Sequence, residues 1–368
     1  MKLKNLFYIL CLAVMPFTAC IQDEALNTEC DIEAVSLDNS RLIGAPVVEN
    51  NRVVFRAKPS IDLTALAPQF TITEGATVVP ASGTVRDFTT PQTYTVTSQD
   101  GKWSKEYTFT FILSEPKTRY SFEHFEKTGR YYDFYELEVT PNAATGQNDT
   151  IKDYWASGNK AFLIGTSDPA TFPTSVEETG VIGSAVHLET KSAGTWGAAL
   201  KMPIAAGNLF LGTFNNSVAL KTPRKATQFG VPFSRKPLRL KGWYKYTPGA
   251  KVTDAANKEV TGRADSLDIY AVFYESPLPD KPHLDGDNVL TDESIVALAR
   301  LDDKSAKEQF TQFNIPFVYR KEIDAEKLAN SEYNLTIVFS SSIDGAYFIG
   351  AAGSTLIVDE VELICDED

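Results

Sequence analysis

The stretch "LRLKGWYKYTPG", Leu238–Gly249, decides the fold class of the larger part of the chain. Side chains alternate along a β-strand. One face is apolar and holds Leu238, Leu240, Tyr244 and Tyr246, with Gly242 as a gap, and the other holds Arg239, Lys241, Trp243 and Lys245. We therefore expect a half-buried strand that ends in a Pro-Gly turn. Trp243 is expected on the outer face, packed under a loop against the stems of its cationic neighbours.

Composition indicates a folded, β-rich protein that is long enough for two domains. The chain has 368 residues, of which 43% are hydrophobic and 11% aromatic, and the β-branched residues Thr, Val and Ile are frequent. A chain of this length can form more than one core. The formal net charge of −13 argues against nucleic acid or an anionic membrane surface as a partner, because both repel an acidic protein.

The first domain is expected over residues 31–114 as an immunoglobulin-like β-sandwich that acts as a spacer. Short alternating runs are separated by turn residues, and the clearest are "IEAVSL", "RVVFRA", "QFTIT", "QTYTVTS" and "KEYTFTFIL". Asp100-Gly101 supplies a hairpin turn between the last two runs. Closely spaced short strands are typical of an immunoglobulin-like sandwich, here without its disulfide.

A second, larger domain is expected over residues 119–368, after the linker-like "SEPKTRY". Strands such as "SLDIYAVFY", "YNLTIVFS" and "STLIVDEVEL" alternate with loops rich in Gly, Pro, Asn and Asp. Helical periodicity is confined to a short stretch at Ile323–Asn330. This pattern predicts a large jelly roll, in which two antiparallel sheets pack face to face. The whole chain is therefore expected to be all-β.

The N-terminus has the features of a targeting segment. Lys2 and Lys4 precede an apolar run that ends in "FTAC" and is too short to span a membrane as a mature helix. It resembles a bacterial lipoprotein signal over residues 1–19, with acylation of Cys20 and a tether over residues 20–30; a plain secretory peptide is the alternative. The "QDE" that follows resembles the export tag of Bacteroidota surface lipoproteins. We therefore expect an outer-membrane protein that faces the cell exterior and touches the membrane through its lipid anchor only.

Two cysteines remain after the predicted cleavage and acylation, Cys30 and Cys365. An extracytoplasmic compartment permits a disulfide between them. Cys30 opens the first domain, however, and Cys365 closes the second, so the chain topology argues against a bridge. The cysteines form no CxxC motif and the three histidines are scattered, so zinc is not indicated.

Standard catalytic signatures are missing from the sequence. There is no GxSxG elbow, HExxH, phosphate-binding glycine loop or dinucleotide fingerprint. Carboxylate pairs such as Asp133 with Glu136 are plentiful, and glycoside hydrolysis needs two carboxyl groups at a definite separation. Most acidic residues of an acidic protein are solvated surface, and a sequence does not give separations. A glycoside hydrolase or related carbohydrate-active enzyme therefore stays an alternative, with no catalytic residue assigned.

The last strand contains an acidic residue among apolar ones. In "STLIVDEVEL" the inward positions are expected to be Ile357, Asp359, Val361 and Leu363. A buried carboxylate without a partner is costly, so Asp359 needs a backbone or basic partner, a bulge that turns it outward, or a bound ion. By analogy with jelly-roll carbohydrate-binding modules, the ion in the third of these alternatives would be a structural Ca²⁺ at Asp359, with Glu123 and Glu126 of "YSFEHFE" as co-ligands. No other cofactor is expected.

Aromatic residues of the second domain are the candidates for ligand contact. Sugar sites pair an aromatic ring with hydrogen-bonding side chains. The carbohydrate-binding candidates are Trp155 in "DYWASGN", Trp196 in "SAGTWGAAL" and Trp243, with Asp133 as a polar side chain. Trp155 and Trp196 lie in loop-like surroundings rich in Gly and Ser. A sugar platform is therefore expected in those loops before Trp243.

A set of segments in the second domain carries a family resemblance. They include "YSFEHFE", "YYDFYELEVTPN", "KPLRLKGWYKYTPG", "DIYAVFYE", "VFSSSIDGAYFIGAAGS" and "LIVDEVEL". Together they resemble the putative carbohydrate-metabolism domain of Bacteroides-type surface lipoproteins, from about Arg119 to Leu363. The resemblance implies an immunoglobulin-like N-terminal domain and a jelly roll similar to sugar-binding modules. It implies no catalytic residues.

Three functions follow from these observations. The first is a surface lipoprotein that binds a glycan in support of polysaccharide use; the second is a glycoside hydrolase; the third is a structural or adhesive surface protein that binds another protein. A groove with two or more exposed aromatic residues favours binding. Two carboxyl groups across a groove, one of them desolvated, favour the enzyme. A flat apolar patch favours a protein partner.

Overall fold

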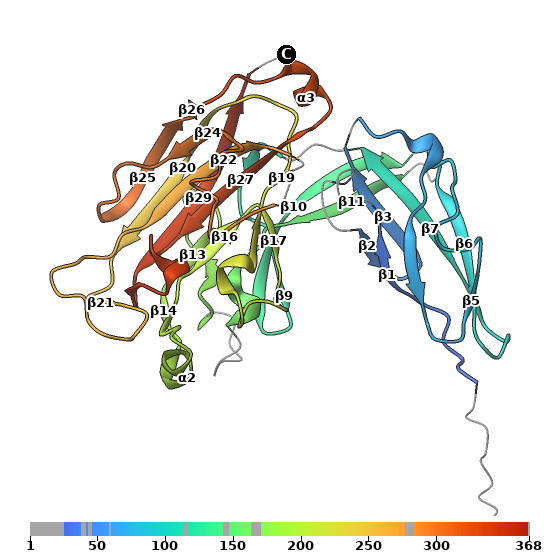
Figure 1. Cartoon of the computed structure of the whole chain (residues 1–368), viewed down its shortest axis with the longest axis horizontal. Helices are drawn as coiled ribbons and strands as arrows, with labels where there is room; N and C mark the ends of the chain where they lie inside the picture. The colour runs from blue at the N-terminus through green and yellow to red at the C-terminus, as the bar shows by residue number, and fades with distance from the viewer. Residues whose placement is uncertain are drawn as a thin grey trace, which may run out of the picture.

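The computed structural model describes residues 26–37, 42, 46–58, 60–113, 117–142, 147–162, 171–276, 278 and 283–366. Regular structure in these ranges is almost entirely β (Figure 1), as predicted. Two short α-helices accompany the strands, α2 (Gly194–Ala199) and α3 (Ala325–Ala329). No helix within the described ranges is long and apolar enough to cross a membrane. The predicted signal peptide and Cys20 lie outside the described residues.

The N-terminal part is the predicted immunoglobulin-like β-sandwich. Its smaller sheet pairs β1 (Ile32–Ser36) with β4 (Gln69–Ile72), and its larger sheet has the order β2 (Val47–Glu49), β3 (Arg52–Ala57), β7 (Ser104–Leu113), β6 (Gln92–Thr97) and β5 (Thr77–Val79). Strands β3 and β7 run parallel. The core is aromatic: Phe55, Tyr94 and Phe109 are fully buried between the layers.

The C-terminal part is the predicted jelly roll, built from two large antiparallel sheets. The first sheet has the order β12 (Thr174–Glu177), β13 (Ala185–Glu189), β29 (Thr355–Cys365), β20 (Pro237–Thr247) and β25 (Lys307–Pro316), with β8 (Arg119–Tyr120) on β29. The second has the order β16 (Asn208–Phe210), β27 (Tyr333–Ser340), β22 (Asp268–Glu275), β24 (Ile295–Arg300) and β26 (Val318–Tyr319), with β19 (Val231–Pro232) on β27. The first and last strands of the jelly roll are therefore neighbours in one sheet.

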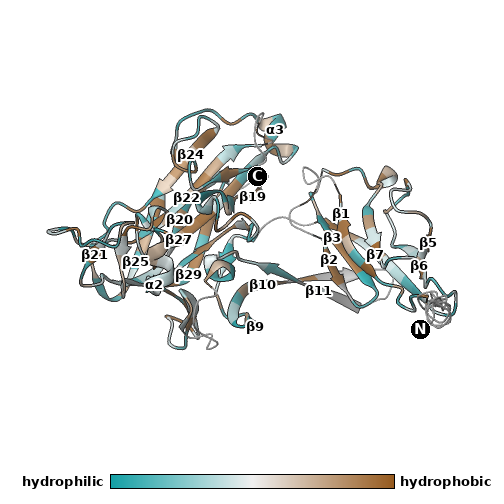
Figure 2. Ribbon diagram, turned by 60° about the horizontal axis from the view of Figure 1, so that its bottom comes forward, coloured by the Kyte–Doolittle hydropathy of each residue, from teal (hydrophilic) through white to brown (hydrophobic). Residues whose placement is uncertain are grey.

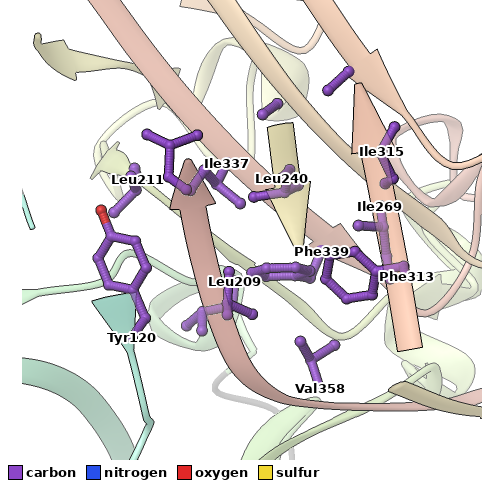
Figure 3. Close-up of a cluster of buried hydrophobic side chains, with 14 of the residues drawn as sticks. Tyr120, Leu209, Leu211, Leu240, Ile269, Phe313, Ile315, Ile337, Phe339 and Val358 are labelled. Atoms are coloured by element: carbon purple, nitrogen blue, oxygen red, sulfur yellow. The ribbon is translucent and has the colours of Figure 1, made fainter. Parts of the chain in front are cut away.

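Strand β20 has the two faces that its sequence predicts, with one correction. Leu240, Tyr244 and Tyr246 are buried in the core between the two sheets, and Figure 3 shows Leu240 among Ile269, Phe313, Ile337 and Phe339. Leu238 is only half-buried, because the pairing of β20 with β29 shifts register between Pro237 and Arg239 and Pro237 takes the inward position. A Cβ at the gap, Gly242, would lie 2.5 Å from the Phe313 ring.

Strand β22 is apolar on both faces because both faces are covered. Ile269 and Phe273 contribute to the core between the large sheets. Tyr270 and Tyr274 contribute to a second cluster on the opposite side, under a three-stranded sheet made of β17 (Gly212–Phe214), β18 (Thr227–Phe229) and β23 (Leu284–Asp285). This explains the unbroken run "DIYAVFY".

A hairpin connects the jelly roll to the N-terminal sandwich. Strands β10 (Tyr131–Asn142) and β11 (Gln147–Tyr154) pair with each other, β10 also pairs with β9 (Phe125–Thr128), and both views show the hairpin extending toward β2 and β3 (Figures 1 and 2). Arg56 of β3 forms an ion pair with Asp153 of β11 at 2.5 Å. Lys58 Nζ donates to the Ser331 carbonyl at 2.6 Å.

Cys30 and Cys365 are not joined by a disulfide. Cys30 precedes β1 in the N-terminal sandwich, whereas Cys365 is the last residue of β29 in the jelly roll. The arrangement agrees with the topological argument against a bridge.

Candidate functional site

Two cavities lie on opposite outer faces of the described part of the jelly roll. The first, here called the aromatic pocket, has a volume of about 360 Å³ and lies against β16, β18, β22 and β27. The second, here called the polar cleft, has a volume of about 650 Å³ and lies against β8, β20, β25 and β29. The core between the two large sheets separates them, and they share no lining residue. Both volumes are within the range of small-ligand sites.

The floor of the aromatic pocket consists of outward-facing side chains of the second sheet and its cover. Phe210, Phe229 and Tyr270 belong to one buried cluster and line the pocket. The Phe210 and Phe229 rings pack edge to face with centroids 5.0 Å apart. Because the rings hold one another in place, the floor is a preformed apolar surface.

The rim of the aromatic pocket combines an exposed ring with charge. Tyr347 lines the pocket and is 50% exposed. Trp196, 70% exposed, is on α2 beside the lining residue Gly197. The Arg224 guanidinium lies over the Tyr347 ring, 4.8 Å from its centroid, and forms an ion pair with Asp287 at 2.8 Å. Cation–π and ionic contacts together therefore orient a charged group and a ring at the pocket mouth.

A buried carboxylate at the edge of the aromatic pocket is fully paired. Asp268 of β22 is 3% exposed. It accepts hydrogen bonds from Arg300 Nε and Nη2 at 3.0 and 2.7 Å and from Lys304 Nζ at 2.6 Å. These bonds raise the pKa of Arg300. Asp268 therefore has a structural role beside the pocket.

The polar cleft is lined by side chains of both signs around one indole ring. Trp243 of β20 and Gln312 of β25 are direct cross-strand neighbours. They line the cleft with Glu136 of β10 and with Glu360 and Glu362 of β29. As predicted, Trp243 is on the outer face of β20, half-buried. It borders a cleft, whereas the sequence predicted packing beneath a loop.

A β-bulge in β29 forms part of the cleft wall. One residue of β20, Gly242, opposes two residues of β29, Glu360 and Val361. Glu360 has a φ of 47°, a left-handed conformation that is uncommon for a residue other than glycine. Bulges re-aim side chains next to functional sites, and here the extra residue brings Glu360 to the cleft.

The same bulge corrects the predicted alternation of β29. Ile357 and Asp359 were expected to face the core, but Val358 does so. Asp359 projects from the opposite face and is nevertheless fully buried. Its Oδ2 accepts hydrogen bonds from the backbone N–H groups of Val181 and Ile182 at 2.6 and 3.2 Å. Two of the predicted solutions, a backbone partner and a bulge, therefore occur together.

Glu136 is a buried carboxyl group in the polar cleft that lacks a partner on one oxygen. The residue is 6% exposed, and within the described residues its Oε1 has no hydrogen-bond partner. Burial raises the pKa of Glu136 to about 7; the charges of Asp153 and Glu360 add to the shift, and Lys117 opposes it. The group therefore keeps its proton well above the usual range of a glutamic acid.

The other two acidic residues of the cleft have different surroundings. Glu362 is paired with Arg119 at 2.9 Å and lies 4.0 Å from Lys241. Burial raises the pKa of Glu360, and the charges of Asp359 and Glu123 raise it further. The cleft thus contains three carboxyl groups in three environments.

The three predicted tryptophans differ in their burial and in their surroundings. Trp155 is 3% exposed and packs in the core against Tyr120 and Phe122. Its ring therefore has no free face for a ligand. The Gly- and Ser-rich context was misleading because Ser157 and Gly158 belong to the start of a short 3-10 helix that follows the buried ring. Trp196 is exposed beside the aromatic pocket, and Trp243 lines the polar cleft.

Asp133 and Glu136 do not face each other. Because Asp133 and Glu136 are three positions apart on β10, they project from opposite faces of the strand. Asp133 lies across from Glu126 on β9 and lines neither cavity. Burial raises its pKa, but it is not placed for the predicted contact with a sugar in either cavity.

The predicted calcium ligands do not form one cluster. Glu123 accepts the Ser184 N–H at 3.1 Å, whereas Glu126 pairs with Lys152 at 2.5 Å. Within the ranges that the structure describes, no group of three or more His, Cys, Asp or Glu side chains is placed to hold a metal ion. The carboxylate of Asp359 is already occupied by N–H donors. These residues do not fit the calcium site as predicted.

Sequence reasoning missed the groups that distinguish the two cavities. Arg224 and Tyr347 gave no local signal, because nothing in their segments shows that two distant loops meet. Glu136 did give one: in "YYDFYELEV" it shares a strand face with Phe134, which is buried. The argument that singled out Asp359 applies equally to this carboxyl group.

Comparisons with known proteins support a carbohydrate-related family. The sequence model described as "Putative carbohydrate metabolism domain" matches residues 121–364. The chain belongs to this family. A second model, described as "SGBP, N-terminal", matches residues 35–111. No curated protein matches the chain.

Two solved structures from Bacteroides are similar to this chain in sequence and in fold. A putative glycoside hydrolase from Bacteroides thetaiotaomicron is 41% identical, covers 94% of this chain and 100% of its own, and has a TM-score of 0.74. A putative glycoside hydrolase from Bacteroides vulgatus is 38% identical, covers 69% of this chain and 100% of its own, and has a TM-score of 0.61. The family resemblance seen in the sequence is confirmed.

Proposed function

We propose that this protein is a lipid-anchored, outer-membrane carbohydrate-binding protein that faces the cell exterior and holds a glycan in the aromatic pocket in support of polysaccharide use. One observation carries the proposal. The exposed ring of Tyr347 lines a pocket of about 360 Å³ next to the Arg224–Asp287 ion pair, and the exposed Trp196 adjoins the lining residue Gly197 in the chain.

The chemistry of this rim suits a sugar. A pyranose ring presents C–H groups that pack on an aromatic face, and its hydroxyl groups need hydrogen-bond donors and acceptors close by. Arg224 supplies donors and Asp287 supplies acceptors beside the Tyr347 ring. The alternative of a protein partner predicted a flat apolar patch, whereas the exposed Tyr347 ring lines a concave site.

The cellular location rests on the N-terminal sequence. The apolar run before "FTAC" and the acidic "QDE" after it predict acylation of Cys20 and export to the surface. The N-terminal sandwich would then lift the jelly roll off the membrane. Metabolic labelling with a palmitate analogue, and protease treatment of intact cells, test this part. Loss of labelling in Cys20→Ala is expected, and labelling that persists in that variant contradicts it.

A glycan array and affinity gels test the binding function. The chain from Gln22 onward contains every described residue and is the protein to use. Trp196→Ala and Tyr347→Ala are each expected to weaken binding about 10-fold, because each removes one stacking surface.

Trp103→Ala is the matched control. Trp103 is also an exposed tryptophan, 62% exposed, but lies in the N-terminal sandwich and should leave binding unchanged. Absence of binding to every glycan, or equal losses in all three variants, would contradict the proposal.

A further inference from the structure

The polar cleft is chemically independent of the aromatic pocket. Its indole and its carboxyl groups lie on the outer face of β20 and β29, and the core between the large sheets separates it from Arg224 and Tyr347. A ligand in one cavity therefore does not contact the other. The function of the cleft must be read from its own residues.

An unpartnered buried oxygen is the main feature of the cleft. Glu136 is more than nine-tenths buried and lines the cleft, yet its Oε1 has no hydrogen-bond partner among the described residues. Leaving a buried polar atom unpaired costs free energy. Such a cost is typically retained where a ligand or a reaction uses the group.

The cleft surrounds Glu136 with the parts needed for acid–base chemistry. Glu360 lines the same cleft from the bulge in β29, and its charge acts on Glu136. Trp243 supplies a ring on which a sugar can pack. Glu362 is occupied by Arg119, which leaves Glu136 and Glu360 as the two carboxyl groups of the cleft without an ion-pair partner in the described structure.

We infer that the polar cleft is a hydrolytic site that cleaves a glycosidic bond in a glycan packed on Trp243, with Glu136 as the proton donor and Glu360 as the proton acceptor. Most glycoside hydrolases use two carboxyl groups, one as the acid and one as the base. The inference does not rest on the binding function proposed for the aromatic pocket.

The step consumes one water molecule and needs no other reactant. Glu136 gives its proton to the glycosidic oxygen while the bond from C1 to that oxygen breaks, and the bonding electron pair stays with the oxygen, so the leaving group departs as an alcohol. A water oxygen forms a bond to C1 and its proton passes to Glu360. Proton exchange with solvent then returns Glu136 to the acid form and Glu360 to the carboxylate.

The electrostatics of the cleft agree with this assignment. Burial, Asp153 and Glu360 hold the proton on Glu136, against the Lys117 ammonium and the Phe122 N–H. The remaining charged or titratable groups that line the cleft are Arg119, Tyr120, His124, Lys241 and Glu362. Since the pKa of Glu136 is raised to about 7, activity should decline as the pH rises through that value.

Hydrolysis of a panel of nitrophenyl glycosides and of plant and host polysaccharides tests the inference. Glu136→Gln and Glu360→Gln should each lower kcat by a factor of about 10² to 10⁴. The decline of activity above neutral pH should vanish from the residual rate of Glu136→Gln, a result that a merely structural role would not produce. Thermal unfolding of each variant checks that the fold is kept.

Asp133→Asn is the matched control. Asp133 is also a partly buried carboxyl group of β10 with a raised pKa, but it lines neither cavity and should retain the activity within about twofold. Trp103→Ala, which changes an exposed tryptophan of the N-terminal sandwich, should also hydrolyse normally. No hydrolysis of any substrate by the unaltered chain between pH 5 and 8, or full activity of Glu136→Gln, would overturn the inference.

Discussion

The two cavities of the jelly roll each have a buried carboxyl group, and the two groups are supported in opposite ways. Asp268 beside the aromatic pocket accepts three hydrogen bonds from Arg300 and Lys304. Glu136 in the polar cleft leaves Oε1 without a partner and has a pKa of about 7. The hydrogen bonds to Asp268 offset the free energy of burying its charge. The oxygen of Glu136 that lacks a partner makes folding less favourable, and contacts elsewhere in the fold offset this free energy.

Under the two functions proposed above, this difference separates binding from reactivity within one fold. In the aromatic pocket the charges neutralise one another and leave rings to contact a ligand. In the polar cleft one acid is kept protonated beside an ionisable neighbour. Removing the buried carboxyl group should therefore have opposite effects on stability in the two places.

The largest expected effect is that of Asp268→Ala. This change leaves the cations of Arg300 and Lys304 without their buried partner, and we expect the free energy of unfolding to fall by about 3 kcal/mol. Urea denaturation at neutral pH measures it. Glu259→Gln, which breaks the exposed pair with Lys251, is the control and should cost less than about 1 kcal/mol. Equal losses in the two variants would remove the distinction drawn for Asp268.

Glu136→Gln should change stability in the opposite direction and in a pH-dependent way. The folded pKa of Glu136 lies above its unfolded value, so the native state binds more protons and stability falls as the pH rises from about 4.5 through about 7. The variant lacks this loss and should be more stable than the unaltered chain at pH 8, by roughly 1–3 kcal/mol. At pH 4.5 the difference should disappear. Urea denaturation at both pH values measures the difference in the free energy of unfolding. A Glu136→Gln variant that is less stable than the unaltered chain at pH 8 would contradict the absence of a partner on Glu136 Oε1.

A smaller effect is expected for Arg224→Ala at the aromatic pocket. The change removes the guanidinium over Tyr347 and the partner of Asp287, and should raise Kd for a bound glycan about 10-fold, or about 1.4 kcal/mol. Isothermal titration calorimetry measures this, and hydrolysis in the polar cleft should not change. Arg263→Ala, which breaks another ion pair outside both cavity linings, is the control. A similar loss of affinity in both variants would show that Arg224 acts only through general charge.

The smallest effect is expected from calcium. Backbone N–H groups already fill the carboxylate of Asp359, so addition of Ca²⁺ or of a chelator should shift Tm by less than about 1 °C. Thermal unfolding with 2 mM CaCl₂ and with 2 mM EDTA checks this. An upward shift of several degrees with Ca²⁺ would restore the calcium hypothesis and would place an ion close to the polar cleft.

Much of the fold was predictable because alternation is a local property of the chain. The faces of β20 follow from residue order alone, and Trp243 lies outward as its position requires. Prediction failed where one residue shifted the register. The bulge at Glu360 moved Asp359 to the opposite face, and at the irregularity beside Leu238 the buried residue is Pro237. A register shift depends on the partner strand, which a single strand does not reveal.

The candidate site was less predictable than the fold. Trp155 seemed a loop residue but anchors the core, because burial of a ring depends on which distant strands cover it. Arg224 and Tyr347 meet although more than a hundred positions separate them in the sequence. Glu136 was within reach of the alternation argument, but the fate of its proton depends on Lys117, Asp153 and Glu360, which three separate segments contribute.

The sequence by itself determined the all-β class, the order of the two β-sandwiches and the outward position of Trp243. Strand periodicity and turns depend on residues that are close together in the chain. The tertiary structure alone decided that Trp243 borders a polar cleft, that Trp196 stands beside a pocket and that Glu136 is unpaired while Asp268 is not. Those outcomes depend on contacts between segments far apart in the chain, and burial, pairing and pKa are properties of such contacts.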